Sequence, residues 1–200
     1  MTTARDLIIT AMDEAERREA GQGELSLALA GAELVDLLAA SAVTLDGDAI
    51  VPAGTPAFDD PLLEQSAAAV VRQKPYESVE YWLWRRGRDL AAAYAAALAE
   101  EGSLAHRRGR SPLGTGRVAV ADSADHRAAR DRWAAHEPVL TALATSAGLR
   151  DKPDDEPPAP PRDPVGIVLA AVEDAVTELE AVRQRRAIEQ AAYDNIWRAP

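Results

Sequence analysis

Apolar residues recur at helical spacing from the first residues of the chain. One face of a predicted N-terminal helix is apolar: Leu7, Ile8, Ala11, Met12 and Ala15. Thr3 and Asp6 have the spacing of a capping box, which places the helix start at Thr3. We expect this helix to end near Gly21 or Gly23, because glycine commonly follows the last helical turn.

A second pattern, from Leu27 to Leu38, is apolar around nearly the whole circumference of a helix. Glu33 and Asp36 are its charged residues. A helix of this kind belongs in a core rather than on a surface. Gly31 has no side chain, so we expect it to permit the close approach of a second helix.

Two short hairpins interrupt the helical pattern. The dipeptide Asp46-Gly47 lies between two β-prone runs, and turn residues divide the segment 104–121 in the same way. Further helices are predicted after Asp60 with Pro61 at the first helical position, around Trp82, and over 88–101, 124–136 and 138–149. Neither strand–helix–strand alternation nor an internal repeat is present, so the sequence predicts an all-α, mainly helical fold in a single domain of residues 1–200.

The C-terminal quarter divides into two parts. The segment 151–164 holds six of the thirteen prolines and five acidic residues, which is typical of an extended surface linker. Asp163 and Pro164 then start a long helix, whose apolar stripe is Val168, Val172, Ala175, Leu179 and Val182. We expect the final part, from Ile188 to Trp197, to pack back on the domain.

Composition narrows the class of protein. The chain has 200 residues, no cysteine and three histidines. The lack of cysteine excludes a disulfide framework, a thiolate zinc site and a cysteine nucleophile. No apolar run approaches the roughly 18 residues that span a membrane, and the N-terminus has no signal-peptide pattern, so we expect a cytoplasmic protein.

Motifs typical of enzymes are incomplete or missing. The chain lacks the full glycine pattern of a dinucleotide-binding loop, the lysine of a phosphate-binding loop and a Gly-x-Ser-x-Gly nucleophile elbow. Asp122, Asp125 and His126 have donor atoms for a hard cation, but carboxylates at a helix start more often interact with the helix dipole. We therefore expect a protein without catalytic activity, cofactor or metal.

Charge is segregated along the chain. The net charge is −11, yet residues 85–117 contain seven arginines and three acidic residues, which gives this segment +4 and the remainder −15. Arginine side chains bind phosphate oxygens in bidentate geometry. Six arginines are therefore candidate phosphate or lipid ligands: Arg85, Arg86, Arg88, Arg107, Arg108 and Arg110. The alternative is that they pair with the abundant acidic residues.

Several strings, in this order, resemble the Golgi phosphoprotein 3 family, which also occurs in bacteria. The resemblance covers most of the chain and rests on these segments: ARDLIITA at 4–11, LAGAELVDL at 29–37, DPLL at 60–63, KP at 74–75 with VEYW at 79–82, and LAEEGSL at 98–104. It implies a buried helical bundle wrapped by amphipathic helices, with small β hairpins and no catalytic activity. Eukaryotic members bind phosphatidylinositol 4-phosphate on Golgi membranes and act as adaptors for cytosolic tails of glycosyltransferases.

The resemblance also implies positions for a lipid site. Where the family has its pocket tryptophan and first arginine, this chain has glycines near 21–23 and Ala30; where it has two later arginines, this chain has Arg88 and Ala91. The family's second hairpin dips into the bilayer, which makes Pro112 and Leu113 the expected membrane contacts.

Three functions are compatible with these patterns. The leading hypothesis is a peripheral adaptor at the inner face of a membrane, binding anionic phospholipid through its arginines and also the cytosolic tails of membrane proteins. The second is a lipid-independent protein scaffold. The third is a winged-helix-like nucleic-acid-binding module, which the acidic remainder opposes, so no nucleic acid is expected. The sequence leaves a homo-oligomer open.

Overall fold

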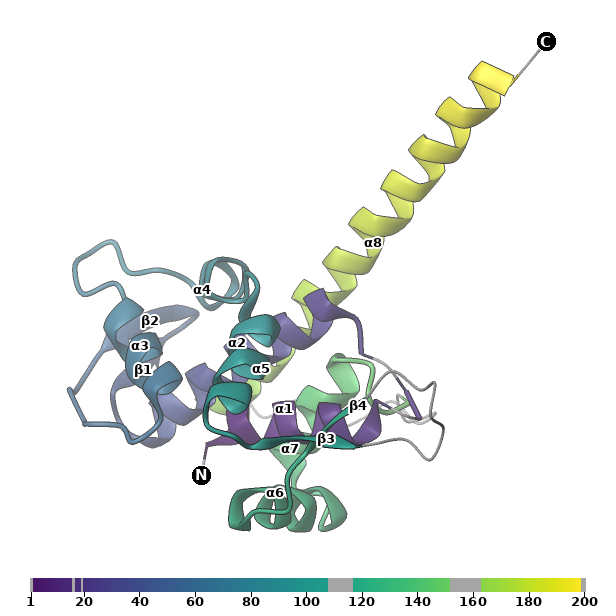
Figure 1. Cartoon of the computed structure of the whole chain (residues 1–200). Helices are drawn as coiled ribbons and strands as arrows, with labels where there is room; N and C mark the ends of the chain where they lie inside the picture. Colours follow the sequence, from purple (N-terminus) through teal and green to yellow (C-terminus); the bar gives the residue numbers. More distant parts are fainter. Residues whose placement is uncertain (1, 16, 19, 108–116, 152–162, 199–200) are drawn as a thin grey trace.

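Figure 1 shows the computed structural model, in which the helices gather around one central helix. The structure describes residues 2–15, 17–18, 20–107, 117–151 and 163–198. The elements in these residues are α1 (Thr3–Glu14), α2 (Gln22–Ala39), β1 (Val43–Asp46), β2 (Ala49–Pro52), α3 (Pro61–Ala69), α4 (Val79–Arg86), α5 (Leu90–Glu100), β3 (Leu104–Arg107), β4 (Arg117–Val120), α6 (Ala124–Ala134), α7 (Pro138–Ser146) and α8 (Pro164–Arg198). The mainly helical fold class is confirmed.

The central helix is α2, as its all-round apolar pattern predicts. It packs against α1, α5, α7 and α8, and most of its residues are buried. A Cβ atom added at Gly31 would lie 2.4 Å from Cγ2 of Val172 on α8, so only glycine lets the two helices approach this closely. The predicted close contact at Gly31 is confirmed.

The N-terminus of α1 differs from its sequence prediction by one residue. Thr2, not Thr3, is the cap, and its hydroxyl accepts a hydrogen bond from the amide of Arg5. Asp6 is not part of a capping box because its carboxylate is buried and pairs with Arg132 of α6. The helix also ends at Glu14, before the glycines that were expected to stop it.

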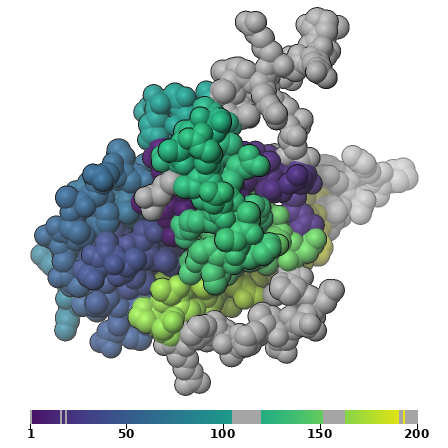
Figure 2. Space-filling view, turned by 90° about the horizontal axis from the view of Figure 1, so that it is seen from below, coloured from purple at the N-terminus to yellow at the C-terminus, as the bar shows by residue number. Residues whose placement is uncertain are grey.

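The first turn of α1 is tied to α2. The amides of Thr3 and Ala4 donate to the carboxylate of Asp36 at 2.9 and 3.2 Å. These amides have no partner within their own helix, so Asp36 satisfies two otherwise orphaned donors. On the opposite side of α1 lies α6, which covers it in the view of Figure 2.

Both hairpins form in the predicted places. In the first, Asp46 is opposite Ala49, and Gly47 adopts a φ of 63°, which favours glycine. In the second, β3 and β4 pair in antiparallel register. The residues between them, 108–116, lie outside the described part of the chain, as do residues 152–162 of the predicted linker.

Helix α8 starts where it was predicted to start and ends differently. Asp163 accepts a hydrogen bond from the amide of Gly166 at 2.7 Å and caps the helix. Its first half packs on the body through Val168 and Val172. The second half projects away from the other helices in Figure 1, and Ile188 is 69% exposed. The expectation that the segment from Ile188 to Trp197 packs back on the domain is wrong, because α8 continues as one helix that carries this segment away from the body.

Within the described residues, no helix is both long enough and apolar enough to cross a bilayer.

Candidate functional site

Arg85, in the last turn of α4, is held by a carboxylate of the same chain. Its guanidinium contacts both oxygens of Glu77, with Nη2 2.8 Å from Oε1 and Nε 3.1 Å from Oε2. Nη2 also donates to the carbonyl of Ala69 at 3.1 Å. The guanidinium carbon lies 5.2 Å from the ring centre of Trp82, in cation–π geometry. These contacts join α4 to the segment that follows α3.

Arg86 makes a second internal ion pair. Its Nε and Nη2 atoms donate to the two carboxylate oxygens of Glu33 at 2.7 and 2.8 Å. Glu33 is completely buried, and its carboxylate also accepts the hydroxyl of Tyr94 at 3.2 Å. Burial raises the pKa of Glu33, although Arg86 opposes that shift, and burial together with the Glu33 charge raises the pKa of Tyr94 as well. This network links α2, α4 and α5.

Arg85 and Arg86 therefore follow the alternative stated for the six arginines, because both pair with acidic residues of the same chain. Each faces a carboxylate that is almost entirely removed from solvent, in the bidentate arrangement that would otherwise receive a phosphate. Displacing either carboxylate would leave a buried charge without a partner, which is costly. Sequence reasoning found both arginines but missed Glu33 and Glu77 as their partners. The sequence did carry a signal that Glu33 has a buried partner, because it is the one glutamate in the apolar stretch 27–38.

Arg88 has a different environment. It is exposed in the turn before α5, and the structure records no ion pair for it among the described residues. It lines an open groove of about 460 Å³ between the start of α2, the α4–α5 turn and α8. Gln22, Trp84 and Leu179 also line this groove, together with the acidic Asp89. The groove has one cation and one carboxylate, so its charge is balanced.

The second hairpin holds the other predicted arginines. Arg107, the last residue of β3, is directly opposite Arg117, the first residue of β4. Arg108 and Arg110 lie outside the described residues, as do the predicted membrane contacts, which are Pro112 and Leu113.

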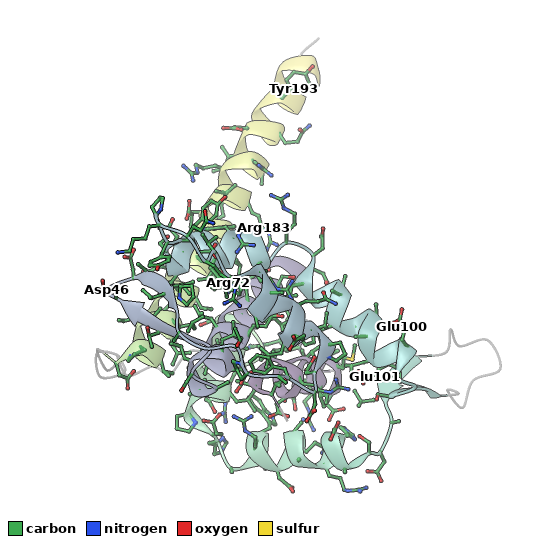
Figure 3. The ribbon with its side chains drawn as sticks, turned by 90° about the vertical axis from the view of Figure 1, so that its left-hand side faces the viewer. Asp46, Arg72, Glu100, Glu101, Arg183 and Tyr193 are labelled. Carbon is green, nitrogen blue, oxygen red and sulfur yellow. The ribbon has the colours of Figure 1, made fainter. Side chains whose placement is uncertain are left out.

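The arginines of this set that the structure describes, at positions 85, 86, 88 and 107, are not gathered at one end of α5. Arg88 precedes α5 and Arg107 follows it, and a helix of 11 residues is about 16 Å long. Figure 3 shows Glu100 and Glu101 at the end of α5 from which the hairpin leaves. The described part of the +4 segment thus divides into a paired set on α4, one exposed arginine at a groove, and a hairpin that leaves from the opposite end of α5.

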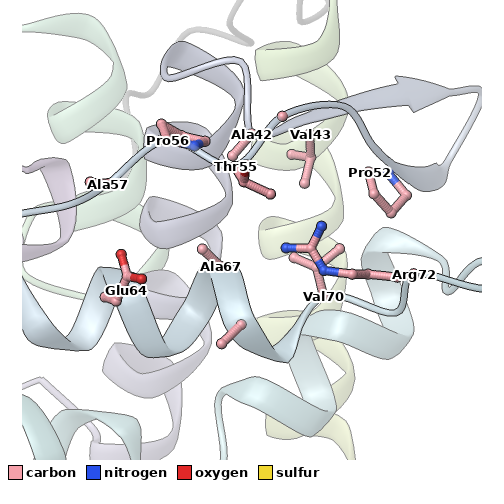
Figure 4. Close-up of a pocket in the computed structure, with 12 residues that line it drawn as sticks. Ala42, Val43, Pro52, Thr55, Pro56, Ala57, Glu64, Ala67, Val70 and Arg72 are labelled. Carbon is pink, nitrogen blue, oxygen red and sulfur yellow. The ribbon is translucent and has the colours of Figure 1, made fainter.

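A second cavity, of about 310 Å³, lies between the first hairpin, the loop after it and α3 (Figure 4). Its walls are mostly apolar, with Val43, Pro52 and Val70 among them. Glu64 and Arg72 stand at its two ends in Figure 4. None of the arginines predicted as ligands lines it.

The candidate metal ligands have other partners. Nε2 of His126 lies 2.7 Å from a carboxylate oxygen of Asp13, and Asp122 pairs with Arg127 at 2.9 Å. Among the described residues, no group of three or more histidine, aspartate or glutamate side chains is arranged to hold a metal ion.

Comparison with known proteins gives one family. The model described as Golgi phosphoprotein 3 (GPP34) matches residues 4–192, which is nearly the whole chain and includes every element from α1 to most of α8. This is a family of lipid- and protein-binding proteins that are not enzymes. No curated protein matches the chain.

Proposed function

Because the chain belongs to the Golgi phosphoprotein 3 (GPP34) family, we propose that it is a peripheral adaptor that binds anionic phospholipid headgroups through its second hairpin. The observation that carries this proposal is the register of β3 and β4, which sets Arg107 directly opposite Arg117. Like charges at opposed positions of an antiparallel pair are destabilising. An anionic headgroup is therefore the kind of ligand that this register and this sequence favour.

The sequence between these two positions strengthens the site. Residues 107–117 contain four arginines, at 107, 108, 110 and 117, and no acidic residue. An arginine close to an anionic membrane surface contributes about 1 kcal/mol to binding. Four of them contribute about 4 kcal/mol, which raises the binding constant by roughly three powers of ten. The rest of the chain, at −15, is repelled by the same surface, so the hairpin is the part that faces the membrane.

Arg88 and its groove form the second part of the proposal. The groove is positioned beside the start of α2, and Arg88 is its exposed cation. We assign to it a selective contact with a headgroup such as phosphatidylinositol 4-phosphate, secondary to the hairpin because Asp89 lines the same groove. Arg85 and Arg86 enter the proposal as residues that hold α4 in place, because both are already paired.

The adaptor part follows from the remaining charge. Cytosolic segments beside transmembrane helices carry an excess of lysine and arginine. An acidic body held at the inner face of a membrane would attract such tails. We therefore propose the cytosolic tails of membrane proteins as partners.

Vesicle co-sedimentation tests the proposal. Neutral vesicles, vesicles with a generic anionic lipid, and vesicles with phosphatidylinositol 4-phosphate are compared at low and near-physiological salt. We expect binding to both anionic types at low salt, and a loss that grows with salt because the attraction is electrostatic. The double variant Arg107→Glu/Arg117→Glu should abolish binding.

A control variant reverses one exposed arginine elsewhere. Arg72→Glu alters an exposed arginine at the other cavity and should leave vesicle binding close to that of the parent protein, apart from the change in net charge. Arg88→Glu should reduce the preference for phosphatidylinositol 4-phosphate more than generic anionic binding. If the hairpin double variant binds as well as the Arg72 variant, the hairpin is not the membrane site.

A further inference from the structure

The cavity between the first hairpin and α3 has no role in the function proposed above. In Figure 4, α3 lies along one side of it, and the start of β1 and the segment 52–57 lie along the other. Its apolar lining includes Val43, Pro52, Ala67 and Val70. Ligand pockets in proteins are mostly apolar, and a volume of about 310 Å³ is at the small end of their range. The cavity therefore suits the end of a chain rather than a folded partner.

One end of the cavity carries a positive charge. The guanidinium of Arg72 points into the cavity in Figure 4, and the residue is exposed to solvent. Within the described chain, Arg72 has neither an ion pair nor a hydrogen bond. It differs in this from Arg85 and Arg86, which are held by buried carboxylates. An anion that enters the cavity can therefore pair with Arg72 without displacing an internal partner.

The opposite end of the cavity carries a negative charge. Glu64 stands there, and one of its carboxylate oxygens accepts a hydrogen bond from the amide of Phe58 at 3.2 Å. This bond holds the carboxylate beside the loop that borders the cavity. From Glu64 to Ala69, α3 rises about 8 Å, and Glu64 forms no ion pair with Arg72. A ligand that uses both ends must therefore carry two opposite charges separated by several ångströms.

The surroundings of Arg72 indicate which anion fits. Val70 precedes Arg72 by two positions, and Val43 lines the same cavity. An anion on Arg72 thus has apolar surface next to it. In a peptide, only the last residue carries a carboxylate and an apolar side chain on the same Cα atom. An internal aspartate or glutamate has its carboxylate in place of the apolar group, and a free amino acid has its ammonium too close to the carboxylate to reach Glu64.

We propose that this cavity binds the carboxyl-terminal end of an extended chain whose last residue is apolar. The terminal carboxylate pairs with Arg72, and the last side chain contacts Val43 and Val70. A lysine or arginine about three positions earlier pairs with Glu64, because an extended chain advances about 3.3 Å per residue.

Cytosolic tails of membrane proteins that end inside the cell supply such chains. Segments beside transmembrane helices are rich in lysine and arginine, which matches the charge of Glu64. The inference rests on the adaptor role proposed above only in naming these tails as the source. The site itself is separate from the second hairpin, since none of its lining residues belongs to β3 or β4.

Fluorescence anisotropy of the full chain with a labelled peptide, Gly-Gly-Lys-Ala-Ala-Leu with a free carboxylate, tests the proposal. Three related peptides are compared with it: one with a terminal amide, one that ends in serine, and one with alanine in place of lysine. We expect the terminal amide to weaken binding by about tenfold, because it removes the charge that faces Arg72. The other two changes should each weaken binding by a smaller factor.

Variants of the protein assign each contact. Arg72→Gln should bind the carboxylate and amide peptides equally weakly. Glu64→Gln keeps an acceptor for the amide of Phe58 and should bind the lysine and alanine peptides equally. Both altered residues are exposed, so both variants should fold. The matched control is Arg130→Gln, which removes an exposed arginine of α6 outside the cavity and should bind like the parent.

Three results would overturn the proposal. One is the absence of peptide binding by the parent at protein concentrations up to about 1 mM. Another is equal binding of the carboxylate and amide peptides. The third is competition by decanoate as strong as that by the unlabelled peptide, which would assign the cavity to an apolar acid without a second charge. The vesicle assay depends on other residues, so a failed peptide titration leaves the membrane proposal standing, and a failed vesicle assay leaves the titration interpretable.

Discussion

Replacing Glu33 by glutamine removes the negative charge that faces Arg86 in the interior. Glutamine has nearly the same shape and retains a carbonyl oxygen, so the hydroxyl of Tyr94 keeps an acceptor. The change therefore isolates the charge of the carboxylate. What remains is a guanidinium that is 16% exposed and has lost its carboxylate partner: the glutamine amide nitrogen cannot accept from Nε, and Nη2 keeps only a neutral carbonyl oxygen.

The expected loss of unfolding free energy follows from the burial of Arg86. Removing one partner of a buried ion pair costs about 3 to 5 kcal/mol, because the other charge stays uncompensated. Arg86 is not fully buried and still donates to the carbonyl of Leu62 at 3.2 Å, so we expect about 3 kcal/mol. For a chain of this length, that loss lowers the unfolding temperature by roughly 6 to 12 °C.

Urea unfolding followed by circular dichroism measures the loss. Asp122→Asn is the matched control, because it removes one carboxylate charge from an ion pair whose side chains are 62% and 77% exposed. We expect it to cost less than about 1 kcal/mol. The double variant Glu33→Gln/Arg86→Met removes both buried charges and should recover most of the stability that Glu33→Gln loses.

Two results would refute this reasoning. A loss for Glu33→Gln no larger than that of the surface control would mean that Arg86 reaches solvent once its partner is gone. A double variant less stable than either single variant would mean that the pair contributes through packing rather than through charge. In the first case, Arg86 would return to the set of arginines available to an external anion.

Two further predictions concern the helix contacts around α2. Gly31→Ala would place a methyl group 2.4 Å from Val172 Cγ2 and should cost about 1 to 3 kcal/mol in thermal unfolding, with much of the loss recovered in combination with Val172→Ala. Burial raises the pKa of Asp36 above its ordinary value of 3.8 although the amides of Thr3 and Ala4 oppose the shift. The folded state therefore holds that proton more tightly than the unfolded state, and this contribution to stability falls as pH rises above 3.8. The variant Asp36→Asn lacks this titration, so its unfolding free energy relative to that of the parent should rise with pH. Denaturant unfolding at several pH values measures this difference. A difference that stays constant with pH would contradict the raised pKa of Asp36.

Local sequence determined most of the secondary structure. Asp60 with Pro61 predicts the start of α3, and the carboxylate of Asp60 accepts the amide of Leu62 at 2.9 Å as expected. Gly47 at the first hairpin and Gly102 after α5 both adopt positive φ angles. These signals succeed because a cap or a turn depends on residues within a few positions of each other. The predicted start of α1 was wrong by one residue at Thr3, where the backbone amide donates to the carboxylate of Asp36, a residue distant in the sequence.

The candidate site shows the limit of the same reasoning. Clustering in sequence predicted one arginine face, but the chain supplies different partners to neighbouring residues. Arg86 pairs with Glu33, which lies 53 positions earlier in the chain, and Arg85 pairs with Glu77, which precedes α4. Arg88 is exposed. Pairing of this kind depends on which helices pack together.

The sequence by itself determined the mainly helical class, the central apolar helix, the two hairpins and the resemblance to the family that matches residues 4–192. Only the tertiary structure decided which arginines are neutralised inside the protein and where α8 leaves it. The apolar stripe of α8 ends at Val182, and the next two positions at the same spacing are Arg186 and Glu189. The sequence therefore carried a sign of where the contacts of α8 end, which the expectation for residues 188–197 did not use. Burial requires a second surface, and the length of the surrounding helices, not the pattern of one helix, determines how far that surface extends.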